Sequence, residues 1–295
     1  MPHVPVLLDE VISLLNLQPG MFVIDGTVDG GGHAAEILER IGPSGKLLGL
    51  DWDETLLEEC KSRLGKYPNV NLLHGNYADL PEILEREDFP KAHALLLDLG
   101  FSSEQLADAG KGFSFNSDEP LLLTYSKDRT PAHEVLRGMR EPEIAQMLFD
   151  LGEERYGLKI AKAIVERQRK SPIRTARDLA ETVSVAVPAG YERGRIHPAT
   201  RTFQALRIFV NDELGNLKRI LGNLDKVLVT GGRVAVISFH SLEDRIVKNA
   251  FRDLEGAQTL EILTKKPIEA SQEEAKGNPR SRSAKLRAAE LKDEY

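Results

Sequence analysis

The sequence predicts an α/β protein in which a parallel sheet with helices on both faces is interrupted by an inserted all-helical domain. Strand-like and helix-like segments alternate through the first hundred residues, which is typical of a parallel sheet. The segment Ala92–Leu99 is almost wholly apolar, as a strand covered on both faces is. The alternation stops after Gly100, and a convincing strand pattern returns only at Arg233–Phe239.

The first part of the chain contains four expected strands with helices between them. Gly42-Pro43 ends the first helix, and Asp53 is the expected N-cap of the helix that follows the second strand. In chain order the elements are Met21–Asp25, His33–Ile41, Lys46–Asp51, Glu54–Leu64, Asn69–Leu73, Pro81–Arg86 and Ala92–Leu99.

Helix signals dominate residues 104–200. Pro142 stands at a helix start, Gly157–Gln168 is amphipathic, and Thr175 with Asp178 fits a capping box. We therefore expect a first α/β part at 1–103, an inserted helical domain at 104–200, and the second α/β part with the C-terminal tail at 201–295. A long helical stretch, Thr202–Leu228, precedes the last strand, and the tail from Lys265 is expected to be loosely ordered.

Composition indicates an ordinary globular protein of 295 residues, with 41% hydrophobic and 29% charged residues. No apolar run approaches the ~20 residues of a membrane span, and no secretory signal is evident, so a cytoplasmic location is expected. The single cysteine, Cys60, excludes an intramolecular disulfide and a multi-cysteine zinc site. No histidine pair has helical ligand spacing, and no metal is expected.

Charge is distributed unevenly along the chain. Residues 1–152 hold 12 Lys and Arg against 26 Asp and Glu, a net −14, whereas residues 153–207 hold 12 against 6, a net +6. A basic block in an acidic protein is the electrostatic footprint of a polyanion partner such as RNA. A solvated helical surface has the same composition, so charge alone does not decide between them.

The stretch Asp25-Gly26-Thr27-Val28-Asp29-Gly30-Gly31-Gly32-His33 follows the first strand and predicts a loop that cradles a nucleotide cofactor. Gly30 to Ala35 satisfies G-x-G-x-x-A, and Asp51 lies about 20 residues further on, so a dinucleotide such as NAD is one interpretation. A carboxylate at the strand tip repels a pyrophosphate but suits the ammonium and sulfonium groups of S-adenosylmethionine. The acids favour the methyl donor.

Three further residues follow strand ends and are candidates for the same site. Asp51 can accept hydrogen bonds from both ribose hydroxyls. Tyr77 can lie against an adenine ring, although an isolated tyrosine is more often part of a core. Asp98 ends a central strand, where ligands bind in open α/β sheets, and is expected near the transferred methyl group and the incoming nucleophile.

Several short motifs follow one another from end to end of the chain. They are HVPVLLDE at 3–10, DGT at 25–27 with GGGH at 30–33, DLGFSSEQL at 98–106, GFSF at 112–115, RIHPATRTFQALR at 195–207, SFHSLEDR at 238–245 and NPRSRSAKLR at 278–287. In these motifs and their order the chain resembles the bacterial ribosomal RNA small subunit methyltransferase H family, which methylates a 16S rRNA cytosine at N4.

The resemblance implies a Rossmann-like S-adenosylmethionine-dependent methyltransferase sheet acting on a decoding-centre cytidine of the small (30S) ribosomal subunit. Donor contacts are implied or expected from Asp25, Gly30, Gly31, Gly32, His33, Asp51, Tyr77, Asp98 and Gln105. By analogy with amino-methyltransferases acting on DNA, Phe101 is expected to stack on the base. The Asp98 carboxylate and the backbone carbonyls of Leu99 and Gly100 are expected to accept the amine hydrogens. His240 is a further candidate facing the substrate, and its alternative role is to precede a capping box formed by Ser241 and Asp244. The expected RNA contacts are Arg195, His197, Arg201 and Arg207.

The chain departs from the family pattern in two places. Asp29 stands where the family usually has glycine, and Leu122 and Thr124 replace an Asp and an Arg of the family. The second departure keeps open a catalytically altered protein that binds the ribosome or assists its assembly. An NAD-dependent oxidoreductase and a homodimer are further possibilities that the sequence leaves open.

Overall fold

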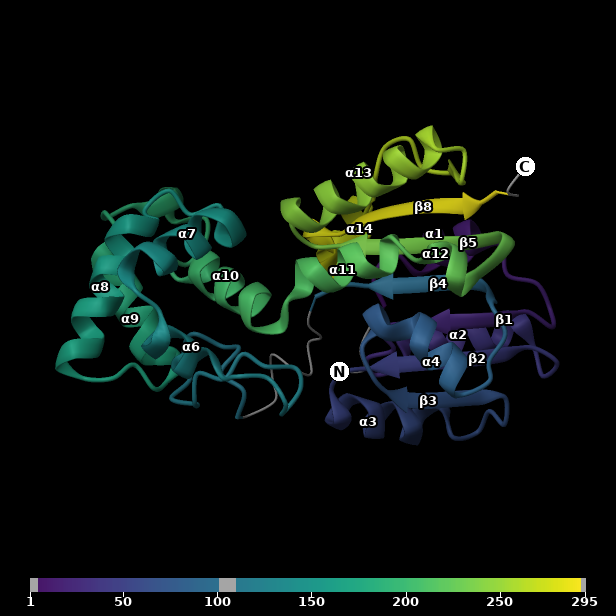
Figure 1. Ribbon diagram of the computed structural model, residues 1–295, viewed down its shortest axis with the longest axis horizontal. Coiled ribbons are helices and arrows are strands. Elements are labelled where there is room, and N and C mark those ends of the chain that lie inside the picture. The colour runs from purple at the N-terminus through teal and green to yellow at the C-terminus, as the bar shows by residue number, and fades with distance from the viewer. Residues whose placement is uncertain (1–4, 101–109, 293–295) are drawn as a thin grey trace. The chain divides into compact units, whose positions relative to one another are not determined.

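The computed structural model describes residues 5–100 and 110–292 (Figure 1). The chain divides into two compact units. The sheet unit comprises Met1–Ser102 and Leu214–Tyr295, and the helical unit comprises Ser103–Glu213. The second unit therefore extends beyond the boundary expected at residue 200 and includes the helix α10 (Thr200–Asn211).

The sheet unit is built on one mixed sheet with the strand order β3-β2-β1-β4-β5-β8-β6, and β7 also pairs with β8. The first five strands along the chain are parallel, and β8 runs antiparallel to β5, β6 and β7. The strands are β1 (Phe22–Asp25), β2 (Lys46–Asp51), β3 (Val70–His74), β4 (Ala92–Asp98), β5 (Leu228–Ser238), β6 (Leu260–Ile262), β7 (Ile268–Glu269) and β8 (Lys285–Leu291).

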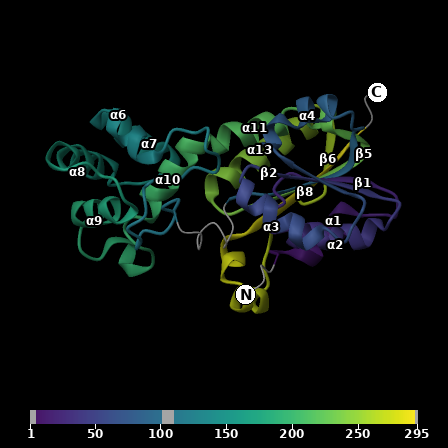
Figure 2. The same ribbon diagram turned by 90° about the horizontal axis from the view of Figure 1, so that it is seen from below.

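Helices cover both faces of this sheet (Figure 2), as the apolar strands predict. Side chains alternate between the faces along each strand. In β1, Val23 packs with α1 (Leu8–Leu15), α2 (Gly32–Ile41) and α3 (Glu54–Leu64). Its neighbour Ile24 belongs to the opposite core, with α4 (Leu80–Arg86), α11 (Glu213–Leu221), α12 (Leu224–Val227) and α13 (Ser241–Gly256). The predicted α/β class is confirmed.

The last parallel strand and the helices before it differ from the prediction. β5 begins at Leu228, not at Arg233. Gly231 and Gly232 do not end the preceding element but lie inside the strand, where the pairing with β4 shifts register. The expected helical stretch Thr202–Leu228 consists of α10, α11 and α12. The break after α10 falls at Asp212, whose φ of 52° is left-handed.

The expectation of a loosely ordered tail is wrong. Residues after Lys265 form β7, α14 (Gln272–Gly277), the 3-10 helix η3 (Pro279–Ser283) and β8, and β8 lies inside the sheet. Charged side chains of β8 are held in ion pairs with other parts of the sheet unit. Arg287 on β8 contacts Asp244 at 2.6 and 3.3 Å, and Arg233 contacts Glu290 at 2.7 Å.

The helical unit has a core of its own. Its helices are α6 (Ala132–Gly138), α7 (Glu141–Gly152), α8 (Gly157–Lys170), α9 (Ala176–Ala186), the 3-10 helix η2 (Tyr191–Gly194) and α10. The capping box of Thr175 and Asp178 opens α9 as predicted. Phe203 and Leu206 of α10 are buried in the same cluster as Ile144 of α7, which explains why α10 belongs to this unit. Among the described residues no helix is long and apolar enough to cross a membrane.

Candidate methyl-donor site

The loop after β1 is fixed by hydrogen bonds to the strands on either side of it. Toward β4, Gly26 N–H donates to the Leu96 carbonyl at 2.9 Å, and Asp98 N–H donates to Thr27 Oγ1 at 2.6 Å. Toward β2, Val28 N–H donates to the Leu50 carbonyl at 2.8 Å. The loop therefore continues the sheet for a few residues before the chain turns into α2.

Two glycines in this loop are required by space and by backbone conformation. A Cβ on Gly26 would lie 2.6 Å from Leu97 Cδ2 and 3.0 Å from the Cβ of Tyr77. Gly31 is the N-cap of α2 with a φ of 77°, and a Cβ there would lie 3.1 Å from Cys60 Sγ. No atom lies within 4 Å of the corresponding position at Gly30, so Gly30 faces open space.

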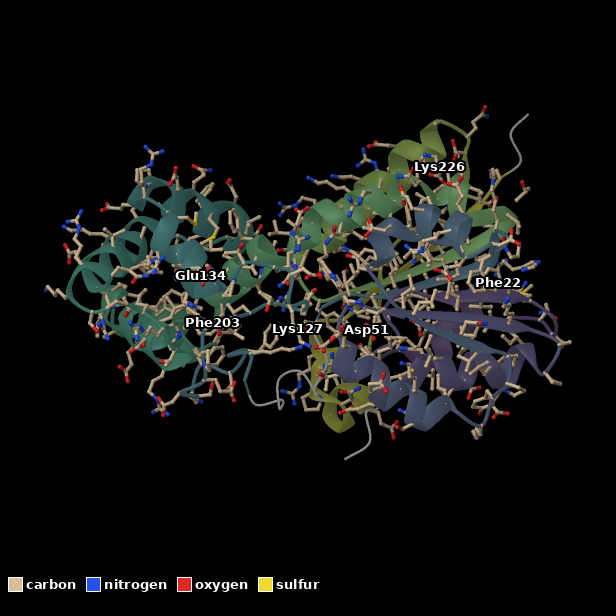
Figure 3. The ribbon with its side chains drawn as sticks, turned by 60° about the horizontal axis from the view of Figure 1, so that its bottom comes forward. Phe22, Asp51, Lys127, Glu134, Phe203 and Lys226 are labelled. Carbon is tan, nitrogen blue, oxygen red and sulfur yellow. The ribbon has the colours of Figure 1, made fainter. Side chains whose placement is uncertain are left out.

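Four aspartates gather at the carboxyl ends of β1, β2 and β4. Asp25, Asp51 and Asp98 end these strands, and the adjoining Asp29 donates its backbone N–H to Asp51 Oδ2 at 2.9 Å. Asp51 Oδ1 accepts a second backbone N–H, from Asp53, at 2.8 Å. Figure 3 shows Asp51 at the edge of the sheet opposite to Phe22, which begins β1.

The pKa values of two of these acids show how unfavourable further negative charge would be here. Burial, with the nearby Asp98 and Asp51 carboxylates, raises the pKa of Asp25 to about 8. Burial and the charges of Asp51 and Asp98 raise the pKa of Asp29 well above its usual range. A ligand with ammonium and sulfonium groups relieves this repulsion, whereas a pyrophosphate adds to it. The residues fit S-adenosylmethionine and not NAD.

His33 lies beside Asp98 in the first turn of α2. Its Nε2 is 2.9 Å from the Val6 carbonyl, an acceptor, so Nε2 carries the ring hydrogen. Its Nδ1 is 3.7 Å from Asp98 Oδ2. Burial lowers the pKa of His33 to about 4, so the ring is neutral near pH 7 and does not neutralise the Asp98 carboxylate.

Four other predicted residues have different outcomes. Tyr77 begins the 3-10 helix η1 (Tyr77–Asp79) and packs against Gly26 at the same edge of the sheet. His240 is the N-cap of α13 and forms the capping box with Glu243, not the expected Ser241 with Asp244, since its Nδ1 accepts the N–H of Glu243. Phe101 and Gln105 lie outside the described residues.

Of the four predicted RNA contacts, three lie at or near the surface of the helical unit. Arg195 and His197 are exposed, and the His197 ring stacks on Phe115 with centroids 4.8 Å apart. Arg201 is partly exposed and contacts Glu192 at 3.3 Å. An exposed histidine held flat on an aromatic ring is a platform on which a nucleic-acid base can stack.

Arg207 does not fit its predicted role. Its guanidinium is buried and makes two hydrogen bonds to Glu213, at 2.8 and 3.0 Å. A bidentate pair of this kind holds the end of α10 and does not present a charge to phosphate. The sequence motif alone could not separate this buried arginine from its exposed neighbours.

The sequence analysis missed three residues that shape the site. Thr27 holds the backbone of Asp98, and Phe239, directly after β5, lies against Gly100, whose Cβ position is 3.4 Å from the ring. Arg280 in η3 lies 6.0 Å from the Phe239 ring centroid. Phe239 lies in the motif SFHSLEDR and Arg280 in the motif NPRSRSAKLR, so the sequence does mark both positions. The second motif falls in the segment that was expected to be loosely ordered.

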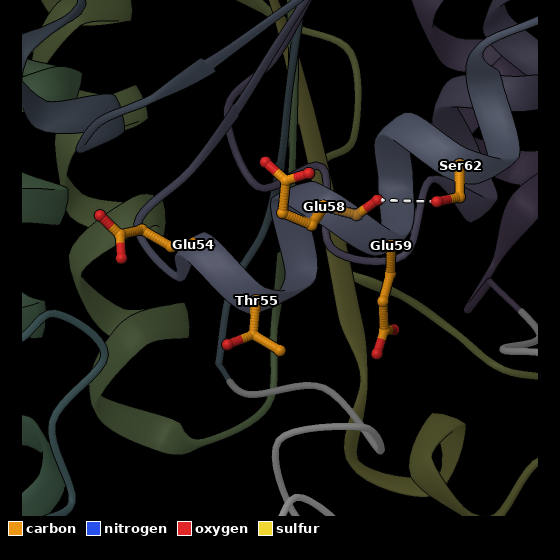
Figure 4. A pocket seen from close by; sticks show the side chains of 5 residues that line it. All are labelled: Glu54, Thr55, Glu58, Glu59 and Ser62. Atoms are coloured by element: carbon orange, nitrogen blue, oxygen red, sulfur yellow. Dashed lines mark hydrogen bonds between the residues drawn. The ribbon is translucent and has the colours of Figure 1, made fainter.

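A separate hollow of about 480 Å³ lies along α3 and is lined by Glu54, Thr55, Glu58, Glu59 and Ser62 (Figure 4). All the lining residues come from one helix. Its Ser62 hydroxyl donates to the Glu58 carbonyl at 3.1 Å, an ordinary intrahelical bond. The hollow is therefore part of the solvent-exposed acidic face of α3.

The fold and the site together define an α/β protein with a cation-favouring ligand site at the carboxyl edge of a parallel sheet. The model of the MraW methylase family matches residues 1–292. The chain is 42% identical to the ribosomal RNA small subunit methyltransferase H of Syntrophobacter fumaroxidans, over 98% of this chain and 96% of the relative. It is 46% identical to the protein of the same name from Koribacter versatilis, over 98% and 94%.

Among solved structures, the chain is similar to a putative rRNA methylase from Clostridium thermocellum, with a TM-score of 0.47 and 11% identity over 98% of this chain and 94% of that one. The sequence matches carry the assignment. The chain belongs to the MraW methylase family. It is a methyltransferase, and its methyl donor is S-adenosylmethionine. The interpretation as an NAD-dependent oxidoreductase is therefore wrong.

Proposed function

We propose that this chain methylates the exocyclic N4 of a decoding-centre cytidine in 16S rRNA of the small ribosomal subunit, and that it acts in the cytoplasm. The names of the relatives support an rRNA substrate in the small subunit. The observation that carries the N4 chemistry is Asp98, a carboxylate that is only 6% exposed at the end of the central strand β4.

Asp98 is suited to act on an amine. The lone pair of cytosine N4 is delocalised into the ring, so the amine is a poor nucleophile until its hydrogens meet acceptors. S-adenosylmethionine supplies an electrophilic methyl group and leaves as a neutral thioether. The neutral His33 beside Asp98 leaves the negative charge of the carboxylate in place to accept an amine N–H and to stabilise positive charge on N4.

The RNA is expected to bind through the helical unit. Arg195 and Arg201 offer charge for phosphates, and the ring of His197 on Phe115 offers a stacking face. The target cytidine must leave its stack to reach a buried carboxylate, as single-stranded rRNA segments permit. Binding should weaken steeply with salt because phosphate contacts release counterions.

The assay that tests the role of Asp98 separates donor binding from methyl transfer. Asp98→Asn keeps the shape of the side chain and removes its charge. We expect its single-turnover rate on unmodified small subunits to fall by about 10²–10³-fold, in excess of any loss in affinity for S-adenosylhomocysteine. Asp79→Asn, on the half-exposed η1, is the matched control. An unchanged rate in Asp98→Asn would remove Asp98 from the chemistry.

A further inference from the structure

Arg280 occupies a distinctive position at the edge of the sheet where the four aspartates gather. It belongs to η3 and lies 6.0 Å from the ring of Phe239, which follows β5. Its positive charge also acts on Asp29, whose pKa it lowers against the effect of burial. Asp29 follows β1 and Phe239 follows β5, and these two strands flank β4, which ends at Asp98.

The segment that carries Arg280 is firmly anchored. The next residue, Ser281, is buried, and its hydroxyl donates to the Asn278 carbonyl at 2.8 Å. Just before it along the chain, Glu274 of α14 accepts the backbone N–H of Leu7, the N-cap of α1, at 2.9 Å. The neighbouring Val6 carbonyl faces His33. These bonds tie the segment of α14 and η3, and the start of the chain, to α2, and so hold the backbone near Arg280 beside the loop between β1 and α2, residues 26–31, called the donor loop below.

Asp29 is held in the donor loop by its backbone conformation and by one hydrogen bond. Its φ of 46° is left-handed, a conformation that costs a non-glycine residue free energy. Its backbone N–H is bonded to Asp51, which holds the residue in that conformation. The result is a carboxylate in the donor loop with a guanidinium acting on it from η3.

The amino-acid end of S-adenosylmethionine carries an ammonium group and a carboxylate. The Asp51 and Asp98 carboxylates favour the ammonium and repel the carboxylate, so the carboxylate needs a cation at the same edge of the sheet. A guanidinium binds a carboxylate through two parallel hydrogen bonds. We propose that Asp29 and Arg280 together hold the amino-acid end of the donor, with Asp29 accepting from its ammonium and Arg280 donating to its carboxylate.

The proposal rests on the identity of the donor and is independent of the RNA target. Titration calorimetry on the full-length protein with two ligands tests it. S-adenosylhomocysteine contains the amino-acid end, whereas 5′-methylthioadenosine has neither the ammonium nor the carboxylate. We expect Arg280→Gln and Asp29→Asn each to weaken S-adenosylhomocysteine by about tenfold or more, and to change the affinity for methylthioadenosine less than twofold.

Two further variants control for structural effects. Arg282→Gln removes an exposed arginine from the same 3-10 helix and should leave both affinities unchanged. Arg280→Lys keeps the charge without the fork and should bind S-adenosylhomocysteine with intermediate affinity. Equal loss of both ligands in Arg280→Gln would assign Arg280 a structural role and overturn the proposal. Unchanged affinity for both, with a raised KM for small subunits, would make Arg280 an RNA contact and overturn it equally.

Discussion

Asp25 gives the sharpest quantitative prediction of the electrostatics at the donor site. Its pKa is about 8 in the folded protein, against an ordinary value of 3.8. Between these values the folded chain holds a proton at Asp25 that the unfolded chain has lost. Stability therefore falls as pH rises, by about 1.4 kcal/mol per pH unit for this one proton, or about 2.7 kcal/mol from pH 5 to pH 7.

The substitution Asp25→Asn removes this dependence and imitates the protonated acid. The amide oxygen can still accept the Thr27 N–H, which Asp25 Oδ1 accepts at 3.2 Å. Asp29 titrates in the same direction and His33 in the opposite one, but both remain in wild type and variant. The difference in unfolding free energy between the two proteins should thus move by about 2.7 kcal/mol in favour of the variant from pH 5 to pH 7.

Urea unfolding at pH 5, 6 and 7 measures this difference. Trp52, the single tryptophan, follows Asp51 in the sheet unit, so its fluorescence reports the unfolding of that unit. Asp253→Asn, at an exposed position of α13, is the control and should run parallel to wild type. If Asp25→Asn also runs parallel to wild type, Asp25 is not held protonated and the electrostatic reasoning fails.

Three more predictions concern packing and the C-terminal segment. Gly26→Ala should lower the free energy of unfolding, measured by heat or urea, by about 2 kcal/mol because the new Cβ meets Leu97. Gly30→Ala, at a position that faces open space, should change it by about 0.5 kcal/mol at most. Equal effects would contradict the close approach of Leu97 to Gly26. Arg287→Met should cost about 3 kcal/mol by removing the shorter of the two ion pairs of Asp244, which also contacts Lys285 at 3.9 Å. An unchanged melting temperature would refute a structural role for the pair of Arg287 and Asp244. Deletion of residues 271–295 removes β8 from within the sheet and should abolish cooperative unfolding of the sheet unit, which circular dichroism would detect; a retained transition would show that the segment is dispensable.

The fold class and the place of the site could be predicted because their strongest signals are local. β2 and α3 have the predicted bounds, since an apolar run ending in Asp51 and the N-cap Asp53 mark them clearly. The carboxyl ends of parallel strands meet at one edge, so the acids that end the strands could be placed together from the strand pattern alone.

The rest depends on side-chain pairings, two of which join distant parts of the chain. From the sequence alone β8 does not look like a strand of the sheet interior, since it contains an arginine. It can lie there because Arg287 pairs with Asp244, more than forty residues earlier. Arg207 looks like its exposed neighbours until its pairing with Glu213 is known. Arg280 reaches the donor loop only because η3 is tied to the start of the chain through Glu274. None of these pairings has a local signature in the sequence.

The central claim is methyl transfer to one cytidine of the small-subunit rRNA. Unmodified 30S subunits and free 16S rRNA are incubated with the protein and labelled S-adenosylmethionine, and the labelled nucleotide is mapped and its methyl position identified. We predict label on N4 of a single decoding-centre cytidine. Label on another nucleotide or atom would contradict the proposed target, and no label on either substrate would favour a catalytically altered ribosome-binding protein.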